Sequence, residues 1–347
     1  METNGQALLR VEGLRVSFST YAGRVQAVRG VSFELHRGEV LAIVGESGCG
    51  KSVTAQTILR LNDPEHCHIE AGKVFFGENA LLTYSERQMQ KVRSSHISMI
   101  FQDPMTSLNP TKRIGEQIVE GLRKHQKIAK QQAWQEAKRM MDLVGIASAE
   151  KRMRQYPHEF SGGMRQRVMI AMALVCNPQV LIADEPTTAL DVTIQAQIID
   201  LMLELRKTLA TAILIITHDM GVVADIADRV AIMYAGVIVE QGPVREIFYQ
   251  PKHPYTWGLL LSIPKSGVQS GQRLIPIDGA PPDLLAPPPG CPFAPRCEYA
   301  MVICHQQMPE ETSCGANHVV KCWLTHSLAP HVERSEPHKS HQEGVTA

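Results

Sequence analysis

The sequence has no apolar run of the roughly 20 residues that a membrane-spanning helix requires. Its longest apolar runs, residues 168–176 and 212–216, have the length of elements buried in a protein core. The N-terminus, Met1-Glu2-Thr3-Asn4-Gly5, lacks a basic segment followed by an apolar one, so we expect no secretory signal. Any role at a membrane is therefore expected to depend on partner proteins.

The sequence also lacks an excess of positive over negative charge, or the reverse. The chain has 35 Lys and Arg against 35 Asp and Glu, and charged residues make up 20% of it. This balance does not predict the basic surface of a nucleic-acid-binding protein. The 347 residues, of which 44% are apolar, suffice for one large α/β domain with an extension or for two domains.

Short apolar runs bounded by turn residues predict buried parallel strands at residues 40–44, 180–183, 213–216 and 230–233. Helical patterns lie between these runs, which predicts a parallel sheet covered by helices. Residues 85–159 are rich in Lys, Arg, Gln and Met, and Ile114, Ile118 and Leu122 have helical spacing. This stretch predicts a mainly helical insertion in the α/β core.

A phosphate-binding motif follows the first of these strands. The pattern G-x-x-x-x-G-K-[ST] is matched by Gly45-Glu46-Ser47-Gly48-Cys49-Gly50-Lys51-Ser52, and a predicted helix over residues 53–61 begins at Val53. Glycines let successive backbone N–H groups surround a phosphate at the positive end of a helix. We expect Lys51 to bridge the β- and γ-phosphates of a nucleotide and the Ser52 hydroxyl to bind Mg²⁺.

Two acids end the strand predicted at residues 180–183. Asp184 and Glu185 follow four apolar residues, at the edge of the sheet where the phosphate loop also lies. We expect Asp184 to hold Mg²⁺ and Glu185 to polarise the attacking water. The two motifs together predict a site that hydrolyses a nucleoside triphosphate.

The segment Phe160-Ser161-Gly162-Gly163-Met164 resembles the signature of ABC ATPases, which is usually Leu-Ser-Gly-Gly-Gln. It departs from that form at its first and last positions, but its serine and both glycines are intact. In this family the segment closes over the γ-phosphate bound to another subunit. The resemblance therefore implies a second ABC ATPase subunit, identical or related.

Three further elements follow the order of the ABC family. Gln102 matches the glutamine that senses Mg²⁺ and faces the membrane partner, and residues 189–191, which end at Asp191, match the loop that crosses the dimer interface. His218 matches the histidine that contacts the γ-phosphate. The resemblance also implies an aromatic residue that stacks on adenine; we favour Tyr21, with Phe18 as the alternative.

The resemblance implies an α/β fold: a RecA-like P-loop ABC ATPase core with a helical subdomain and a C-terminal extension that contains cysteines. We place the ATPase domain at residues 1–245, with its helical subdomain at about 86–160. The extension is placed at 246–330, in a domain apart from the ATP site, and we predict that the polar tail 331–347 is disordered.

The extension resembles the D-type ATPase subunits of bacterial oligopeptide and dipeptide permeases, in residues 248–256, 279–282 and 290–297. This implies an ATP-hydrolysing subunit of an importer of dipeptides or oligopeptides, peripheral at the cytoplasmic face of the membrane. Its implied partners are two transmembrane permease subunits and, through them, an extracytoplasmic solute-binding protein. Importers of nickel, glutathione and some oligosaccharides share this subfamily. An exporter ATPase, or a soluble ABC ATPase of DNA repair or translation, is the alternative.

Five of the eight cysteines lie near the C-terminus. The spacing Cys291-x₅-Cys297-x₆-Cys304-x₁₇-Cys322 is neither the short zinc pattern nor the ferredoxin pattern, so it leaves open zinc and thiols without a metal. The resemblance adds a [4Fe–4S] cluster, which some permease ATPases of this type hold there. Cys314 is a spare thiol, and His318 is a weaker substitute ligand.

Overall fold

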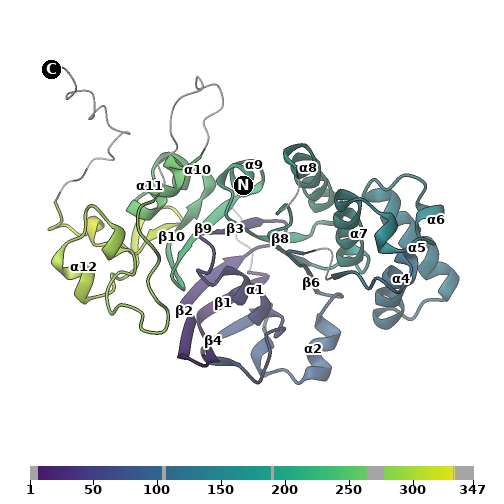
Figure 1. Ribbon diagram of the computed structural model, residues 1–347, viewed down its shortest axis with the longest axis horizontal. Helices are drawn as coiled ribbons and strands as arrows, with labels where there is room; N and C mark the ends of the chain where they lie inside the picture. Colours follow the sequence, from purple (N-terminus) through teal and green to yellow (C-terminus); the bar gives the residue numbers. More distant parts are fainter. Residues whose placement is uncertain (1–6, 104–106, 189–190, 264–276, 331, 333–347) are drawn as a thin grey trace, which may run out of the picture.

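A computed structural model describes residues 7–103, 107–188, 191–263, 277–330 and 332. Figure 1 shows two sheets at the centre, helices α4 to α7 at one end and the region around α11 and α12 at the other. Among the helices that the structure describes, none has both the length and the apolar character needed to cross a membrane.

The larger sheet has eight strands, in the order β11-β12-β10-β9-β3-β8-β7-β6. Its five parallel strands are β3 (Val40–Val44), β6 (Ile97–Ile100), β7 (Val180–Asp184), β8 (Ala212–Thr217) and β9 (Arg229–Tyr234). Four of these coincide with the strands predicted from apolar runs, which are thereby confirmed. Strand β3 lies between β8 and β9, so the phosphate-binding motif follows a central strand.

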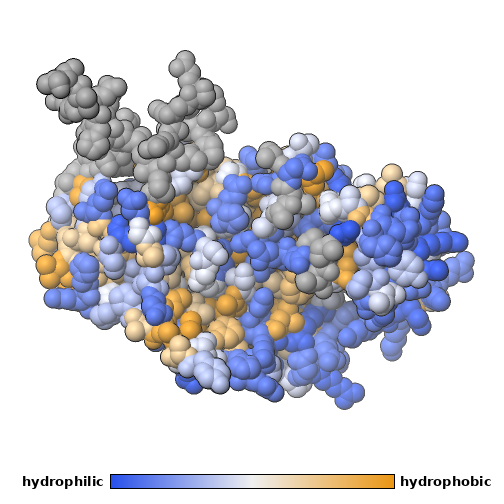
Figure 2. Space-filling model, in the orientation of Figure 1, coloured by the Kyte–Doolittle hydropathy of each residue, from blue (hydrophilic) through white to orange (hydrophobic). Residues whose placement is uncertain are grey.

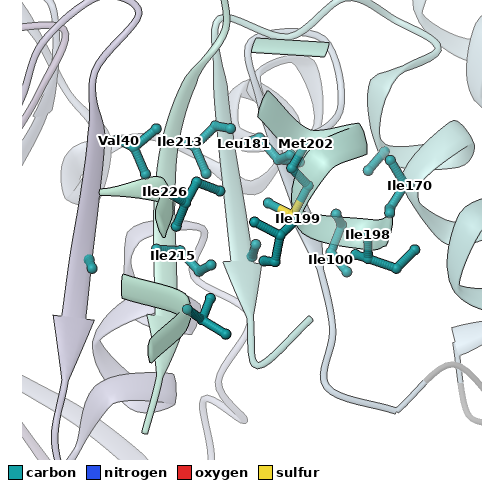
Figure 3. Close-up of a cluster of buried hydrophobic side chains, with 14 of the residues drawn as sticks. Val40, Ile100, Ile170, Leu181, Ile198, Ile199, Met202, Ile213, Ile215 and Ile226 are labelled. Atoms are coloured by element: carbon teal, nitrogen blue, oxygen red, sulfur yellow. The ribbon is translucent and has the colours of Figure 1, made fainter. Parts of the chain in front are cut away.

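Both faces of this parallel sheet are buried. Val40 and Ala42 of β3 pack in one hydrophobic cluster, while Leu41 and Ile43 pack in another on the opposite face. Figure 3 shows the first cluster, in which Ile198, Ile199 and Met202 of α8 (Val192–Leu209) pack against the strands. Helices α7 (Gly162–Leu174) and α9 (Met220–Ile226) cover the same face. This double burial explains why the strands read as continuous apolar runs.

The second sheet is antiparallel, in the order β2-β1-β4-β5. Its strands are β1 (Leu9–Thr20), β2 (Gly23–Leu35), β4 (Cys67–Phe76) and β5 (Asn79–Ala80). Leu9, Leu14 and Phe33 from this sheet meet the second cluster of the larger sheet, together with α1 (Lys51–Ile58) and α2 (Glu86–Val92). The phosphate-binding motif and α1 therefore lie between the two sheets.

The helical insertion contains α4 (Ile114–His125), α5 (Lys130–Leu143) and α6 (Ala149–Arg152), and it leads into α7. Ile114, Ile118 and Leu122 are all buried on one face of α4, as their spacing predicted. The predicted start of the insertion near residue 86 needs correction, because residues 97–100 form β6, which pairs with β7 in the larger sheet. This segment, Ile97-Ser98-Met99-Ile100, is too short to reveal the period of a strand.

The C-terminal region continues the larger sheet. After β10 (Val237–Pro243) come α10 (Val244–Tyr249), α11 (Pro254–Leu261) and α12 (Val302–Gln306), then β11 (Thr312–Gly315) and β12 (His318–Val320). The remaining short helices are 3₁₀ turns: Leu81–Thr83, Pro157–Glu159, Ala294–Arg296 and Trp323–Thr325. Strand β12 pairs with β10, and β11 pairs with β12. The predicted tail 331–347 lies outside the described residues, except for residue 332.

A buried carboxylate helps to hold this region. The side chain of Glu240 in β10 accepts hydrogen bonds from the backbone N–H groups of Lys252 and His253, and a ring nitrogen of His318 lies 2.8 Å from it. Glu240 is 1% exposed, and these partners satisfy its buried carboxyl group by hydrogen bonds within the protein. Figure 2 shows hydrophobic surface near α12, where Val302 is exposed, and a mostly hydrophilic surface over α4 to α6.

Candidate functional site

Glycines at Gly45 and Gly50 let the phosphate-binding motif pack tightly against its surroundings. A Cβ atom on Gly45 would lie 2.0 Å from the carbonyl oxygen of Met233, and one on Gly50 would lie 2.2 Å from that of Ala27. Gly50 also has a φ of 99°, in the left-handed region that favours glycine. The motif therefore forms a loop of a shape that side chains at these positions would disrupt.

Helix α1 begins at Lys51, two residues before the predicted start, and ends at Ile58 rather than near residue 61. Its early end follows from Arg60, whose φ of 51° is left-handed and stops the helix. The first turn of α1 thus opens directly onto the loop. Unpaired backbone N–H groups at such a helix start are a suitable anion site.

The side chain of Lys51 folds back along the loop and is 4% exposed. Its Nζ donates hydrogen bonds to the carbonyl oxygens of Gly45, at 2.7 Å, and Glu46, at 2.9 Å. The ammonium group is therefore held inside the loop, where a phosphate oxygen can exchange for a carbonyl.

Ser52 and Asp184 come together from different elements. The Ser52 hydroxyl donates to Oδ1 of Asp184 at 2.9 Å, at the end of β7. Burial raises the pKa of Asp184, the Ser52 hydrogen bond opposes this, and the charge of Glu185 adds to it. A buried carboxylate next to a hydroxyl is a fitting pair of oxygen ligands for Mg²⁺.

Glu185 is held by several polar groups. Its carboxylate accepts from Nε2 of Gln102 at 2.8 Å and from the Thr188 hydroxyl at 2.9 Å, and Nδ1 of His218 lies 3.5 Å away. The backbone of Glu185 has a φ of 47°, which is unusual for a residue other than glycine. Strain of this kind clusters at functional sites.

These groups line one cavity of about 430 Å³. It is lined by Ala27, Ser47, Gly48, Gly50, Lys51, Ser52, Val53, Gln102, Glu185 and His218. The structure thus brings together the predicted phosphate loop, Gln102, Glu185 and His218, at the carboxyl end of the parallel strands. Ligands of open α/β sheets bind at this edge.

The predicted signature segment lies elsewhere and does not line this cavity. Ser161 caps the N-terminus of α7, and its hydroxyl accepts from the N–H of Met164. A Cβ atom on Gly163 would lie 3.0 Å from Ile194, near the start of α8, which Asp191 caps. Ala189 and Leu190 lie outside the described residues. Ser161 and Gly162 are therefore exposed at the start of α7, outside this cavity.

Neither candidate for adenine stacking lines the cavity. Tyr21 lies in the turn between β1 and β2 and is fully exposed, while Phe18 packs at the margin of the second hydrophobic cluster. The assignment of Tyr21 stays a prediction.

Sequence reasoning missed two contacts of the phosphate loop. Arg296 pairs with the carboxylate of Glu46, and the Tyr255 hydroxyl accepts from the Glu46 N–H at 2.9 Å. Both residues belong to the extension, which was predicted to form a domain apart from the ATP site. No sequence signal could have found the first contact, because 250 positions separate its partners.

The four cysteine thiols that were predicted to bind a metal cluster influence one another electrostatically. Burial raises the pKa of Cys291 and of Cys297 to about 11 and that of Cys322 to about 12, and neighbouring thiols, including Cys304, add to each shift. Cys314 stands apart, near Lys252 and Glu240. Within the described residues, no three His, Cys, Asp or Glu side chains are arranged so that they could hold a metal ion.

Two family models match the chain. Residues 28–188 match the model described as ABC transporter, and residues 239–304 match the oligopeptide/dipeptide transporter C-terminal region. The dipeptide transport ATP-binding protein DppD of Bacillus subtilis is 54% identical over 94% of this chain and 97% of its own length. The oligopeptide transport ATP-binding protein OppD of the same species is 57% identical, over 96% and 93%.

Solved structures share the fold. The ABC protein cbiO1 of Clostridium perfringens, part of the transporter complex cbiONQ, has a TM-score of 0.61 and 30% identity, over 71% of this chain and 92% of its own. The ATP-binding cassette MJ0796 has the same TM-score at 23% identity, over 68% of this chain and 99% of its own. The α/β fold of ABC cassettes is thereby confirmed for this chain.

Proposed function

The chain belongs to the family of ABC transporter ATP-binding subunits of oligopeptide and dipeptide transporters, and on this basis we propose that it powers peptide import. It binds and hydrolyses ATP, and this hydrolysis drives transport through separate transmembrane subunits. The observation that carries the proposal is the single cavity in which the phosphate loop meets Gln102, Glu185 and His218.

The roles of the site residues follow from their chemistry. Backbone N–H groups of residues 45–53 and Nζ of Lys51 hold the phosphates of ATP. Glu185 polarises the attacking water, while Gln102 and Thr188 keep its carboxylate in place. His218 contacts the γ-phosphate, and Tyr21 stacks on adenine. Positioning and charge stabilisation are the main sources of rate in such reactions.

Mg²⁺ fits the oxygen ligands at this site. Ser52, Asp184 and Gln102 would hold the ion, which neutralises charge on the β- and γ-phosphates when bound. Asp184 supports this assignment because its buried carboxylate has only the Ser52 hydroxyl as a described hydrogen-bond partner.

We propose that ATP lies between two ABC subunits. Ser161, Gly162 and Gly163 of one subunit would close over the γ-phosphate held by the other, and Asp191 would lie at their interface. The exposed N-terminus of α7, away from the chain's own cavity, supports this arrangement. Closure of the pair would move two transmembrane permease subunits that receive solute from an extracytoplasmic binding protein.

We further propose that the subunit is peripheral at the cytoplasmic face of the cell membrane. Its ATPase domain would span residues 1–245 and its extension residues 246–330. The helical subdomain, predicted at about 86–160, would begin only after β6. Residues 331–347 would form a disordered tail. The extension does not stand apart from the core, because β12 extends the core sheet.

A [4Fe–4S] cluster held by Cys291, Cys297, Cys304 and Cys322 is a finer proposal. Its support is the mutual electrostatic influence of these four thiols and the resemblance to permease subunits that hold such a cluster. A cluster of several irons needs its ligands farther apart than a single ion does. We expect anaerobically purified protein to be brown, with about four irons per chain, since thiolate ligation of iron gives colour and zinc does not. Colourless, iron-free protein with one zinc would favour the zinc alternative.

The decisive experiment is affinity purification of the full chain from membranes, followed by reconstitution of what purifies with it. Two multi-span proteins and ATP hydrolysis stimulated by a binding protein loaded with peptide are the expected results. Stimulation by nickel, glutathione or an oligosaccharide instead would change the solute. Absence of any membrane partner would favour a soluble ABC ATPase.

A further inference from the structure

Glu46, the second residue of the phosphate loop, faces the C-terminal extension rather than the nucleotide cavity. Ser47 and Gly48 line that cavity, while the Glu46 carboxylate binds Arg296 in a bidentate pair. The two hydrogen bonds measure 2.8 Å, from Nη1 to Oε2, and 3.1 Å, from Nη2 to Oε1. This forked geometry is the strongest form of a pair between arginine and a carboxylate.

The guanidinium group of Arg296 is held by hydrogen bonds to all of its N–H groups. A guanidinium group has five N–H donors, and here all five have acceptors. Beside the two bonds to Glu46, Nε donates to Asp278 O, Nη2 to Ile277 O and Nη1 to the Tyr234 hydroxyl. The guanidinium also stacks near the rings of Tyr234 and Phe293. Its side chain is 5% exposed, so this pair differs from the mobile ion pairs of protein surfaces.

A second residue of the extension holds the backbone of Glu46. The hydroxyl of Tyr255, in α11, accepts a hydrogen bond from the Glu46 N–H. The centroid of its ring lies 4.6 Å from the ring centroid of Tyr234 and 5.3 Å from that of Phe293. Tyr255 is fully buried. In Figure 1 this part of the extension lies beside β9 and β10, at the end of the molecule opposite the helical subdomain.

The contact reaches the nucleotide site through Lys51. The carbonyl oxygen of Glu46 accepts from Nζ of Lys51, so the position of Glu46 sets one of the two carbonyl oxygens that hold this ammonium group. We propose that Arg296 is a positioning residue for ATP binding, which holds the phosphate loop in its binding conformation through Glu46. The inference rests on the proposed ATPase function and adds a residue outside the ATPase motifs to its site.

The experiment measures the affinity of the full chain for a non-hydrolysable ATP analogue with Mg²⁺, by calorimetry, alongside thermal unfolding. The variants are Arg296→Gln, Arg296→Lys, Glu46→Gln and the double variant Glu46→Gln/Arg296→Gln. Arg229→Gln is the matched control, because Arg229 forms a partly buried pair with Glu39 at 3.0 Å, at the opposite end of β9 from Tyr234. Lys51→Ala marks the loss of the phosphate site itself.

We expect Arg296→Gln to weaken binding about tenfold and Arg296→Lys less, since lysine keeps the charge but not the fork. The control should bind normally even where it unfolds at a lower temperature. The double variant should bind no worse than Arg296→Gln alone, because both changes remove one interaction. In the reconstituted transporter, KM for ATP should rise while kcat stays nearly constant.

Wild-type affinity in Arg296→Gln, or additive losses in the double variant, would overturn the inference. So would an equal loss of affinity in Arg229→Gln, because the effect would then follow from general destabilisation. If Arg296→Gln does not fold, Arg296→Lys and Glu46→Gln still provide the comparison. Wild-type protein that binds no ATP would instead refute the proposed function.

Discussion

Glu185 combines two features that a merely structural carboxylate does not need. Its backbone is in a left-handed conformation, and its carboxylate is oriented by hydrogen bonds from both Gln102 and Thr188. A side chain fixed in this way can polarise a water molecule without having to reorganise during the reaction. Its position directly after Asp184 places it beside the proposed metal ligands.

We expect Glu185→Gln to lower steady-state ATP hydrolysis at least about 10²-fold, because glutamine cannot act as a general base. ATP binding should persist, since the phosphate loop is unchanged, and an ATP-bound dimer should accumulate. Turnover and gel filtration with ATP are the measurements, and Glu204→Gln, an exposed change in α8, is the control. Near-normal turnover in the assembled transporter would contradict the assignment.

The burial of Asp184 lowers the stability of the folded protein when its carboxylate is charged. Burial raises its pKa above the ordinary value of 3.8, so the folded protein binds a proton there more tightly than the unfolded chain. Stability from this group is present at low pH and is lost as pH rises through the raised pKa. At neutral pH without metal or nucleotide, the charged carboxylate therefore destabilises the fold.

We expect Asp184→Asn to raise the Tm of the nucleotide-free protein at pH 7 by about 1–2 °C, the shift that about 1 kcal/mol produces in a chain of this length. The gain should shrink as pH falls towards 4, and Mg²⁺-dependent hydrolysis should be lost. Thermal unfolding across this pH range tests the idea, with the exposed Asp200→Asn as control. A lower Tm at pH 7 would show that the charge is compensated by groups other than Ser52.

At the scale of elements, the start of α7 offers a position where a substitution should change activity without lowering stability. A Cβ atom on Gly162 would meet nothing within 4 Å, and the same holds for Gly121 in α4. Gly121 lies inside α4, where replacement of glycine by alanine stabilises a helix by roughly 0.5–1 kcal/mol. Gly162 is instead the first residue of α7, where this gain is smaller, and it belongs to the signature segment.

We therefore expect neither Gly162→Ala nor Gly121→Ala to lower stability, with the larger gain at Gly121, and we expect ATP binding by the isolated chain to be unchanged. Only Gly162→Ala should impair hydrolysis, by about 10²-fold, since its methyl group would stand where the partner's γ-phosphate has to approach. Chemical unfolding and ATPase rates check both parts. Equal activity of the two variants would remove the signature segment from the site.

The elements that sequence predicted well are those with continuous signals. Four buried parallel strands were found because both their faces are apolar, and the phosphate loop because its residues are contiguous. Strand β6, and the return of β11 and β12 to the core sheet, were not predicted, because these strands are short and their pairing depends on distant partners. The same reason hid the contact of Arg296 with Glu46.

At the scale of the whole molecule, the phosphate loop and the signature segment lie apart, as the proposed site between two subunits requires. The cavity at Lys51 and the helix start at Gly162 are separate, and no described residue of the signature segment lines the cavity. A monomer therefore lacks one half of the proposed site. Hydrolysis by the isolated chain should be slow and should depend on protein concentration.

This arrangement predicts complementation between two inactive variants. Lys51→Ala removes the phosphate site but keeps the signature segment, whereas Gly162→Ala does the reverse. In a symmetric dimer each site uses one half from each chain, so a mixed dimer holds one intact site. Random pairing makes half of the dimers mixed, and an equal mixture should recover up to about a quarter of the wild-type rate. Each variant alone should stay inactive at the same total concentration. A mixture no more active than its components, at concentrations where the wild type hydrolyses ATP, would show that these two segments do not meet across a dimer of this chain.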